Sequence, residues 1–218
     1  MILVGLGGGS GSGKSYLASK IKERLPDQTL ILPLDSYYKP FSDKPKFERM
    51  QINFDDPETF DWALLKEHLD KLKRGESIKK PDYSYSEFTR VGYEEVEPHE
   101  IIVLEGLYAL YNLEIVDRMD LKIFLDPADD VRAVRRVRRD VKKRDRDVEF
   151  AVRQYLEKTR GMHSKEVDPT RENADFVFDD EEKNRFVEVV EKLFHKKEAK
   201  TTPKIKAFVE EKMEKAEV

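Results

Sequence analysis

The feature of the sequence that most restricts its fold is a glycine-rich segment near the N-terminus. Residues 8–15 read Gly-Gly-Ser-Gly-Ser-Gly-Lys-Ser and match the pattern G-x-x-x-x-G-K-[ST] at every position. An apolar run at 2–6 precedes the segment, and a helical pattern with Leu17, Ile21 and Leu25 four residues apart follows it. A strand, a phosphate loop and a helix in this order predict a nucleotide-binding α/β protein.

The residue types of this segment suit phosphate binding. Glycines let the backbone curl so that successive N–H groups point at phosphate oxygens, and the helix N-terminus adds partial positive charge. We expect Lys14 to reach the β- and γ-phosphates and Ser15 to offer its hydroxyl to Mg²⁺. The predicted nucleotide site, for ATP or GTP with Mg²⁺, consists of Gly8, Gly9, Ser10, Gly11, Ser12, Gly13, Lys14, Ser15 and Tyr16.

Apolar runs alternate with helical patterns along most of the chain. This alternation predicts a mostly parallel sheet covered by helices on both faces. Residues 82–93 alternate aromatic and polar types, which predicts a ribbon or hairpin. The predicted strands are 2–6, 29–34, 101–104, 121–125 and 175–178, and the predicted helices are 14–25, part of 54–73, 130–144, 149–159, 184–194 and a weak charged tail at 196–218.

The composition excludes several classes of site. There is no cysteine, which removes disulfides, thiolate nucleophiles and cysteine zinc sites, and the four histidines are scattered. The formal net charge of −4 argues against a chain that binds polyanions over its whole surface. No apolar run has the length of a membrane span, and no leader-like segment precedes the first strand. We therefore expect a cytoplasmic protein without a membrane partner.

Two acidic residues follow predicted strands. Glu105 comes directly after the apolar run 101–104, and Asp35 follows the strand at 29–34. Ligands of parallel α/β sheets bind beyond the carboxyl ends of the strands, so both side chains are expected near the phosphate loop. Glu105 is then a candidate Mg²⁺ partner beside Ser15, and Asp35 a candidate base for an attacking hydroxyl. From position alone, an ordinary turn aspartate is the favoured interpretation of Asp35.

Two further aspartates precede the helix predicted within 54–73. Asp56 followed by Pro57 has the pattern of a helix N-cap with proline at the first helical position. Asp55 is then left to bind the hydroxyls of a sugar. Without further information, a capping role is the favoured interpretation of both aspartates.

The segment 132–146 is strongly basic, with nine Arg or Lys residues against two Asp. It suits a solvated helix face, a nucleic-acid-binding patch, or a lid that brings arginines onto transferring phosphates. Nucleic-acid binding lacks support, because the net charge is negative and no stacking motif accompanies the run. In a chain with a phosphate loop, the lid is the favoured interpretation.

Taken together, these motifs resemble the uridine/cytidine kinase family, within the wider phosphoribulokinase and uridine kinase group of P-loop kinases. The resemblance extends from residue 2 to about residue 178. The matching pieces are residues 8–15, Asp35-Ser-Tyr-Tyr, Asn53-Phe-Asp-Asp-Pro, Phe60-Asp-Trp, Leu64-Leu, Pro81-Asp-Tyr83-Ser-Tyr, Thr89-Arg90, Leu104-Glu-Gly-Leu, Phe124-Leu-Asp, Arg135-Arg136-Val-Arg-Arg139-Asp140, Arg144-Asp-Arg146-Asp and Gln154-Tyr155.

The resemblance implies a P-loop kinase fold and a role for each matching residue. It implies a mostly parallel sheet flanked by helices, a β-hairpin insertion that binds substrate, and an arginine-rich lid at about 128–160, all within a domain at 1–195. Asp35 matches the base that acts on a sugar 5′-hydroxyl, with Lys14, Arg139 and Arg144 as further catalytic residues. The substrate-binding residues it implies are Asp55 for the ribose, Tyr83 and Phe88 for the base, and Arg136, Arg146 and Gln154; Ser15 and Glu105 keep the metal role.

Two positions depart from the family pattern. Phe88 stands where the family commonly has a histidine that contacts the pyrimidine, and phenylalanine packs but makes no hydrogen bond. Loss of a group that hydrogen-bonds a substrate relaxes or redirects specificity. Asp145 stands where the family often has glycine between two lid arginines, which puts a carboxylate among phosphate-binding cations. Both departures concern the acceptor more than the reaction, and the chain after residue 178 also departs from the family.

The leading hypothesis is an ATP- and Mg²⁺-dependent kinase that phosphorylates the 5′-hydroxyl of uridine or cytidine, and that forms homo-oligomers as the family tends to do. An alternative keeps the reaction but takes another sugar, a sugar phosphate or a polyol as acceptor, because of Phe88. A nucleotide-dependent switch or nucleic-acid-associated ATPase is a third hypothesis, with segment 132–146 as its binding surface. A non-catalytic nucleotide-binding protein is the fourth, and the presence of both Lys14 and Asp35 argues against it.

Overall fold

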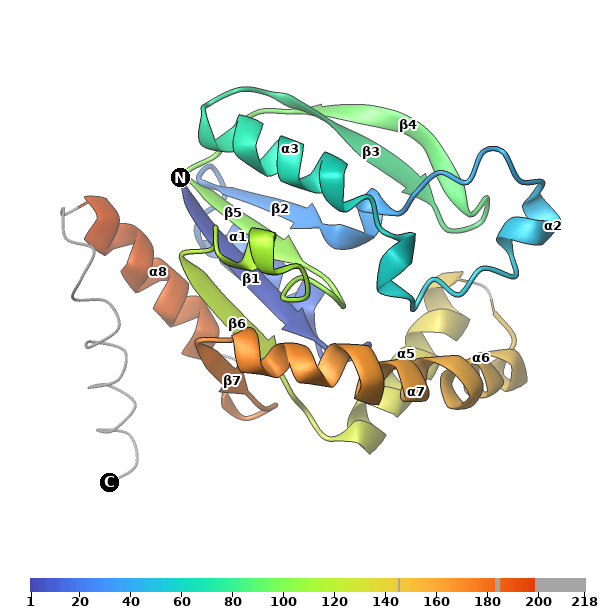
Figure 1. Cartoon of the computed structure of the whole chain (residues 1–218). Coiled ribbons are helices and arrows are strands. Elements are labelled where there is room, and N and C mark those ends of the chain that lie inside the picture. The colour runs from blue at the N-terminus through green and yellow to red at the C-terminus, as the bar shows by residue number, and fades with distance from the viewer. Residues whose placement is uncertain (145, 183–184, 199–218) are drawn as a thin grey trace.

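A five-stranded parallel sheet forms the centre of the molecule (Figure 1). The computed structural model describes residues 1–144, 146–182 and 185–198. The strands of the sheet lie in the order β2-β5-β1-β6-β7, and each described pair is parallel, which confirms the predicted sheet. Their bounds are β1 Ile2–Gly8, β2 Thr29–Pro33, β5 Ile101–Glu105, β6 Leu121–Leu125 and β7 Phe176–Phe178.

Helices cover both faces of this sheet, and an antiparallel hairpin lies over one of them (Figure 1). The helices are α1 Lys14–Arg24, α2 Lys46–Arg49, α3 Trp62–Lys73, α4 Leu113–Val116, α5 Asp129–Arg144, α6 Val148–Gln154, α7 Arg160–Met162 and α8 Arg185–Glu198. The hairpin consists of β3 Ile78–Ser84 and β4 Thr89–Val96, so it extends beyond the predicted 82–93 at both ends. The predicted P-loop kinase architecture is thus present, with the hairpin added on the α3 face.

The two faces of the sheet hold separate apolar cores. On one face, Val4 and Leu6 of β1 pack with α1 and α8, and all of β1 is buried. On the other face, Leu3 belongs to a core that includes α3, α4 and the hairpin. Alternate residues of β1 therefore serve opposite cores, as the two-residue period of a strand requires. A strand buried on both faces explains the continuous apolar run in the sequence.

The chain after β2 differs from the sequence-based boundaries. The strand ends at Pro33, and Leu34 already belongs to the 3₁₀ turn Leu34–Tyr37.

Asp56 does act as a cap, accepting a hydrogen bond from the Glu58 N–H at 2.9 Å, but it caps only the short turn Pro57–Thr59.

The helix predicted within 54–73 therefore begins later than the Asp56-Pro57 pattern indicated. It is α3, and it has its own N-cap in Asp61, whose carboxylate accepts from the Leu64 N–H at 3.1 Å. Residues 53–61 therefore lie outside α3, in a segment that includes the turn Pro57–Thr59.

The arginine-rich segment forms α5, which joins α6 through a short connection that includes Asp145. That residue lies outside the described residues. The predicted helix at 149–159 is correct in position, but α6 ends at Gln154 and continues as the π-helical turn Tyr155–Thr159. Helical structure then continues through residues 160–173, which the sequence analysis did not predict. Only Val167 and Thr170 of this segment are buried, so its sequence carries no apolar stripe.

Most of the predicted tail at 196–218 lies outside the described residues, which end at 198. Its first residues belong to α8. Within the described residues, no helix combines the length and apolar character needed to cross a membrane.

Candidate nucleotide and acceptor site

The loop between β1 and α1 requires glycine at two positions. Gly11 has φ 84° and Gly13 has φ 100°, a left-handed region that L side chains rarely adopt. A Cβ atom at Gly11 would also lie 2.3 Å from the main-chain oxygen of Arg132. Gly13 is the N-cap of α1 and no side chain caps that end, so the first N–H groups of the helix are left to bind an anion.

Lys14 is buried against the phosphate loop. Its Nζ atom donates hydrogen bonds of 2.8 Å to the main-chain oxygens of Gly8 and Gly9, and it lies 3.4 Å from Ser12 Oγ. Burial lowers the pKa of Lys14 to about 8, although the charge of Glu105 opposes the shift. Gly8, Gly9 and Ser12 therefore hold the lysine, which in turn lines the cavity described below.

Ser15 and Glu105 form the candidate metal site. The Ser15 hydroxyl donates to Glu105 Oε1 at 2.9 Å. Burial raises the pKa of Glu105, although the positive charge of Lys14 opposes the shift. No cluster of three or more metal-ligating side chains occurs among the described residues. One hydroxyl and one carboxylate fit Mg²⁺, which keeps several waters and takes its other ligands from substrate phosphates.

Asp35 lies in the 3₁₀ turn after β2 and lines the same cavity as Lys14. The hydroxyl of Tyr85 donates a 2.8 Å hydrogen bond to Asp35 Oδ2. The guanidinium of Arg144 lies 4.4 Å from the centre of the Tyr85 ring. The sequence analysis did not select Tyr85 as a site residue, although its two-residue spacing from Tyr83 was a usable signal.

Asp55, the predicted ribose-binding residue, lines the same cavity. Thr159, on the π-helical turn, donates to Asp55 Oδ2 at 2.7 Å, and Arg136 Nη1 lies 3.7 Å from Oδ1. The hydroxyl of Tyr108 donates to the main-chain oxygen of Asp55. Asp55 is thus fixed by contacts from three other parts of the chain, whereas Asp56 caps the following turn as predicted.

Aromatic rings line the same cavity as Asp55. Tyr83 packs against Tyr38 and Phe54, with ring centres 5.1 and 6.1 Å apart, and Phe88 stacks on Phe54 at 5.9 Å. Phe88 has φ 53°, a strained conformation for a bulky residue, at the tip of the hairpin. A wall of this kind offers flat apolar surface to a planar group and no hydrogen bond from position 88.

The arginines of α5 surround one buried carboxylate, Asp140. Its Oδ1 atom accepts from Arg139 Nε and Nη2 at 3.0 and 2.9 Å and lies 3.5 Å from Arg144 Nη1. Arg136 Nε is 3.6 Å from the other oxygen. Asp140 therefore sets the spacing of three predicted site residues, a role that the sequence analysis did not assign to it.

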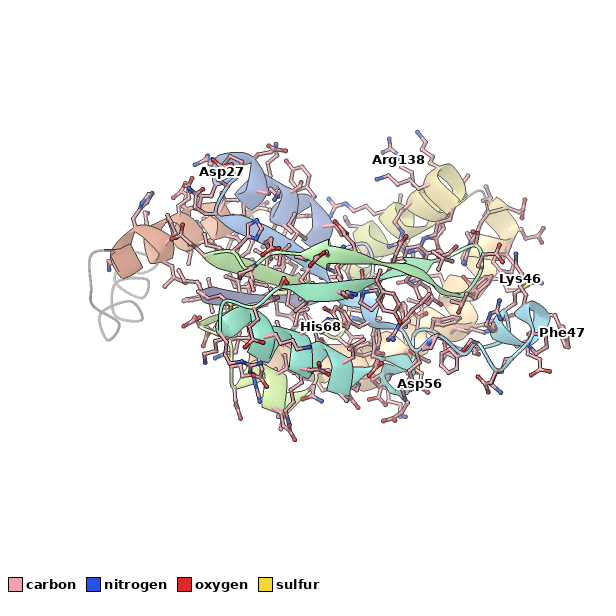
Figure 2. All side chains as sticks on the ribbon, turned by 90° about the horizontal axis from the view of Figure 1, so that it is seen from above. Asp27, Lys46, Phe47, Asp56, His68 and Arg138 are labelled. Atoms are coloured by element: carbon pink, nitrogen blue, oxygen red, sulfur yellow. The ribbon has the colours of Figure 1, made fainter. Side chains whose placement is uncertain are left out.

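Arg146 and Gln154 complete the predicted set. Arg146 donates to the side-chain oxygen of Gln154, and burial lowers the pKa of Arg146. Not every arginine of α5 belongs to the site: Figure 2 shows the Arg138 side chain pointing away from the body of the protein, and it is exposed.

A single cavity of about 450 Å³ connects these groups. Of the predicted residues, Gly8, Gly9 and Ser12 do not line it. The predicted residues that do are Ser10, Gly11, Gly13, Lys14, Ser15, Tyr16, Asp35, Asp55, Tyr83, Phe88, Glu105, Arg136, Arg139, Arg144, Arg146 and Gln154. Lining residues that the sequence analysis did not select include Met50, Ile52, Tyr85, Arg135 and Lys158.

The sequence of this chain is similar to those of known proteins. The sequence model of the phosphoribulokinase/uridine kinase family matches residues 3–187. A protein of Halobacterium salinarum named uridine kinase is 39% identical over 175 residues, which cover 80% of this chain and 78% of that protein. A uridine kinase of Clostridium novyi is 41% identical over 186 residues, covering 84% and 89%.

Solved structures show the same fold at lower identity. The phosphoribulokinase of Rhodobacter spheroides superposes with a TM-score of 0.57 at 14% identity, over 82% of this chain and 69% of that one. The D-glycerate 3-kinase of Cryptococcus neoformans has a TM-score of 0.54 at 19% identity, over 76% and 78%.

Proposed function

Because this chain belongs to the phosphoribulokinase/uridine kinase family and is a phosphotransferase that acts on a hydroxyl group, we propose that it phosphorylates the 5′-hydroxyl of a pyrimidine nucleoside with ATP and Mg²⁺. The relatives named uridine kinase supply the acceptor class. The observation that supports it most directly is that the phosphate loop, Asp35 and Asp55 line one cavity.

The acceptor end of the cavity has the polarity that a nucleoside needs. Asp55 presents a carboxylate suited to a ribose diol, and Tyr83, Phe54 and Phe88 present ring surface suited to a base. A small polyol or a sugar phosphate would leave that ring surface uncovered. The geometry therefore favours a nucleoside over the alternative acceptors.

The residues near the phosphate loop divide the work of phosphoryl transfer. Asp35 accepts the proton of the attacking hydroxyl. Lys14 contacts the β- and γ-phosphates, and Arg139 and Arg144 stabilise the charge that develops on the transferring group. Ser15 and Glu105 would hold the Mg²⁺, which neutralises phosphate charge when bound. Positioning and electrostatics supply most of the rate enhancement in reactions of this kind.

The experiment is a measurement of ADP formation with Mg²⁺-ATP against a panel of acceptors. The panel contains uridine, cytidine, ribulose 5-phosphate, pantothenate, glycerate, simple sugars and polyols, with no-acceptor and RNA controls. Turnover that depends on uridine or cytidine is expected. Turnover only with a non-nucleoside acceptor, or ADP formation stimulated by RNA alone, would contradict the proposal.

A further inference from the structure

We propose that Tyr85 is a positioning residue that couples the catalytic base Asp35 to the lid arginine Arg144. The inference rests on the proposed function, because it concerns how that same site is aligned for transfer. Tyr85 lies in the turn of the hairpin, directly after β3, whereas Asp35 follows β2 and Arg144 ends α5. One side chain therefore contacts residues from two other parts of the fold.

The hydroxyl of Tyr85 fixes one oxygen of the base. It donates to Asp35 Oδ2 at 2.8 Å, and among the described residues no hydrogen bond or ion pair reaches Oδ1. An ionised carboxylate accepts at both oxygens, so one can be held by the protein while the other takes the proton of the attacking hydroxyl. A carboxylate tied in this way keeps one orientation, and misplacement of a reacting group by about 1 Å can reduce a rate by about a hundredfold.

The tyrosine stays a donor over the whole working pH range. Tyr85 is partly exposed, and its partial burial raises the pKa of its hydroxyl, which the charge of Asp35 raises further. The hydroxyl is therefore protonated at neutral pH and gives its hydrogen to Asp35.

The ring of Tyr85 locates the lid arginine. The guanidinium of Arg144 lies 4.4 Å from the ring centre, within the range of a cation–π contact. On its other side, Arg144 Nη1 is 3.5 Å from Asp140 Oδ1. Arg144 is therefore held between an aromatic face of the hairpin and a carboxylate of the lid helix, close to the cavity that the γ-phosphate would enter.

Two substitutions separate the two contacts. Tyr85→Phe removes the hydroxyl and keeps the ring, and Tyr85→Leu removes both. We expect Tyr85→Phe to lower kcat at least tenfold, with KM for ATP and for the acceptor within about twofold of wild type, because only the orientation of the base changes. Tyr85→Leu should lower kcat further. In an Arg144→Ala background, Tyr85→Leu should cost no more than Tyr85→Phe, since the ring then has no arginine to hold.

The matched control is Tyr93→Phe, which removes a hydroxyl from an exposed tyrosine of the same hairpin. It should keep wild-type kcat. A Tyr85→Phe enzyme with wild-type kcat would overturn the inference, as would a loss of kcat explained by a lowered unfolding temperature. The assay uses whichever acceptor the panel identifies. Failure of the proposed function is distinct, because it appears as a wild-type enzyme that turns over no acceptor in the panel.

Discussion

At the scale of single residues, the proposed acceptor site depends on polar contacts between distant parts of the chain. Asp55 accepts from Thr159, which is 104 positions away, at 2.7 Å. Thr159 is buried and lies on a π-helical turn, a local distortion that often occurs at functional sites. A buried hydroxyl that donates to a carboxylate both stabilises the charge and fixes its orientation.

Thr159→Val replaces that hydroxyl with a methyl group of similar volume. A hydrogen bond to a charged group contributes about 1.5–3 kcal/mol, so we expect KM for the acceptor to rise roughly tenfold or more, with little change in KM for ATP. Steady-state kinetics with each substrate varied in turn measure the effect. Thr159→Ser keeps the hydroxyl and should stay near wild type. A KM for the acceptor that is unchanged in Thr159→Val, or that rises equally in Thr159→Val and Thr159→Ser, would contradict a specific role for the hydrogen bond.

The buried lysine of the phosphate loop gives a pH dependence. The free protein has a Lys14 pKa of about 8 because of burial, against 10.5 for the unfolded chain. Between these values the unfolded chain binds one more proton, so this group's contribution to stability rises with pH. ATP phosphates favour the charged form, so nucleotide binding near pH 9 should take up a proton.

Titration calorimetry in buffers of different ionisation enthalpy measures that uptake. The apparent affinity for ATP should fall about tenfold between pH 7 and pH 9, since at pH 9 most of the free protein has a neutral Lys14. Lys14→Arg keeps its charge at every pH in this range and should show no uptake from this position. An affinity that is constant from pH 7 to pH 9 would contradict this assignment.

At the scale of elements, the sequence predicted those helices, strands and loops that depend on local patterns. The five strands of the sheet, the phosphate loop, α1 and the basic helix follow from apolar runs, glycines and periodicity. The sequence analysis did not assign roles to Tyr85, Thr159 and Asp140, because each acts through contacts that only the folded chain creates. The Tyr85–Asp35 pair spans 50 positions. The late start of α3 was not predicted for another reason. Asp56 and Asp61 are both suitable N-caps, and the sequence does not show which of them begins the long helix.

The lid helix depends on Asp140, the carboxylate shared by three arginines. Removing one partner from a buried ionic cluster leaves charge uncompensated and typically costs about 3–5 kcal/mol. We expect Asp140→Asn to lower both the free energy of unfolding and kcat, because Arg139 and Arg144 lose their common partner. Urea unfolding and initial rates measure the two effects. Asp130→Asn, at an exposed position of the same helix, is the control and should change neither. Two unchanged values for Asp140→Asn would contradict this role.

At the scale of the whole molecule, three parts of the fold meet at one cavity. The parallel sheet contributes the phosphate loop, Asp35 and Glu105 at the carboxyl ends of its strands; the hairpin contributes Tyr83 and Tyr85; and the lid contributes the arginines. The apolar cores lie on the two faces of the sheet and leave this edge to polar groups. Under the proposed function, phosphoryl transfer requires all three parts to be in place around the substrates.

The measurement that tests this account most directly is the fate of the γ-phosphate. The protein is incubated with Mg²⁺, γ-³²P-labelled ATP and uridine or cytidine, and the products are separated and identified. The account predicts label in the nucleoside 5′-monophosphate, one for each ADP formed, and loss of that transfer in Asp35→Asn while ATP binding is retained. Label released only as inorganic phosphate, or full transfer by Asp35→Asn, would contradict it.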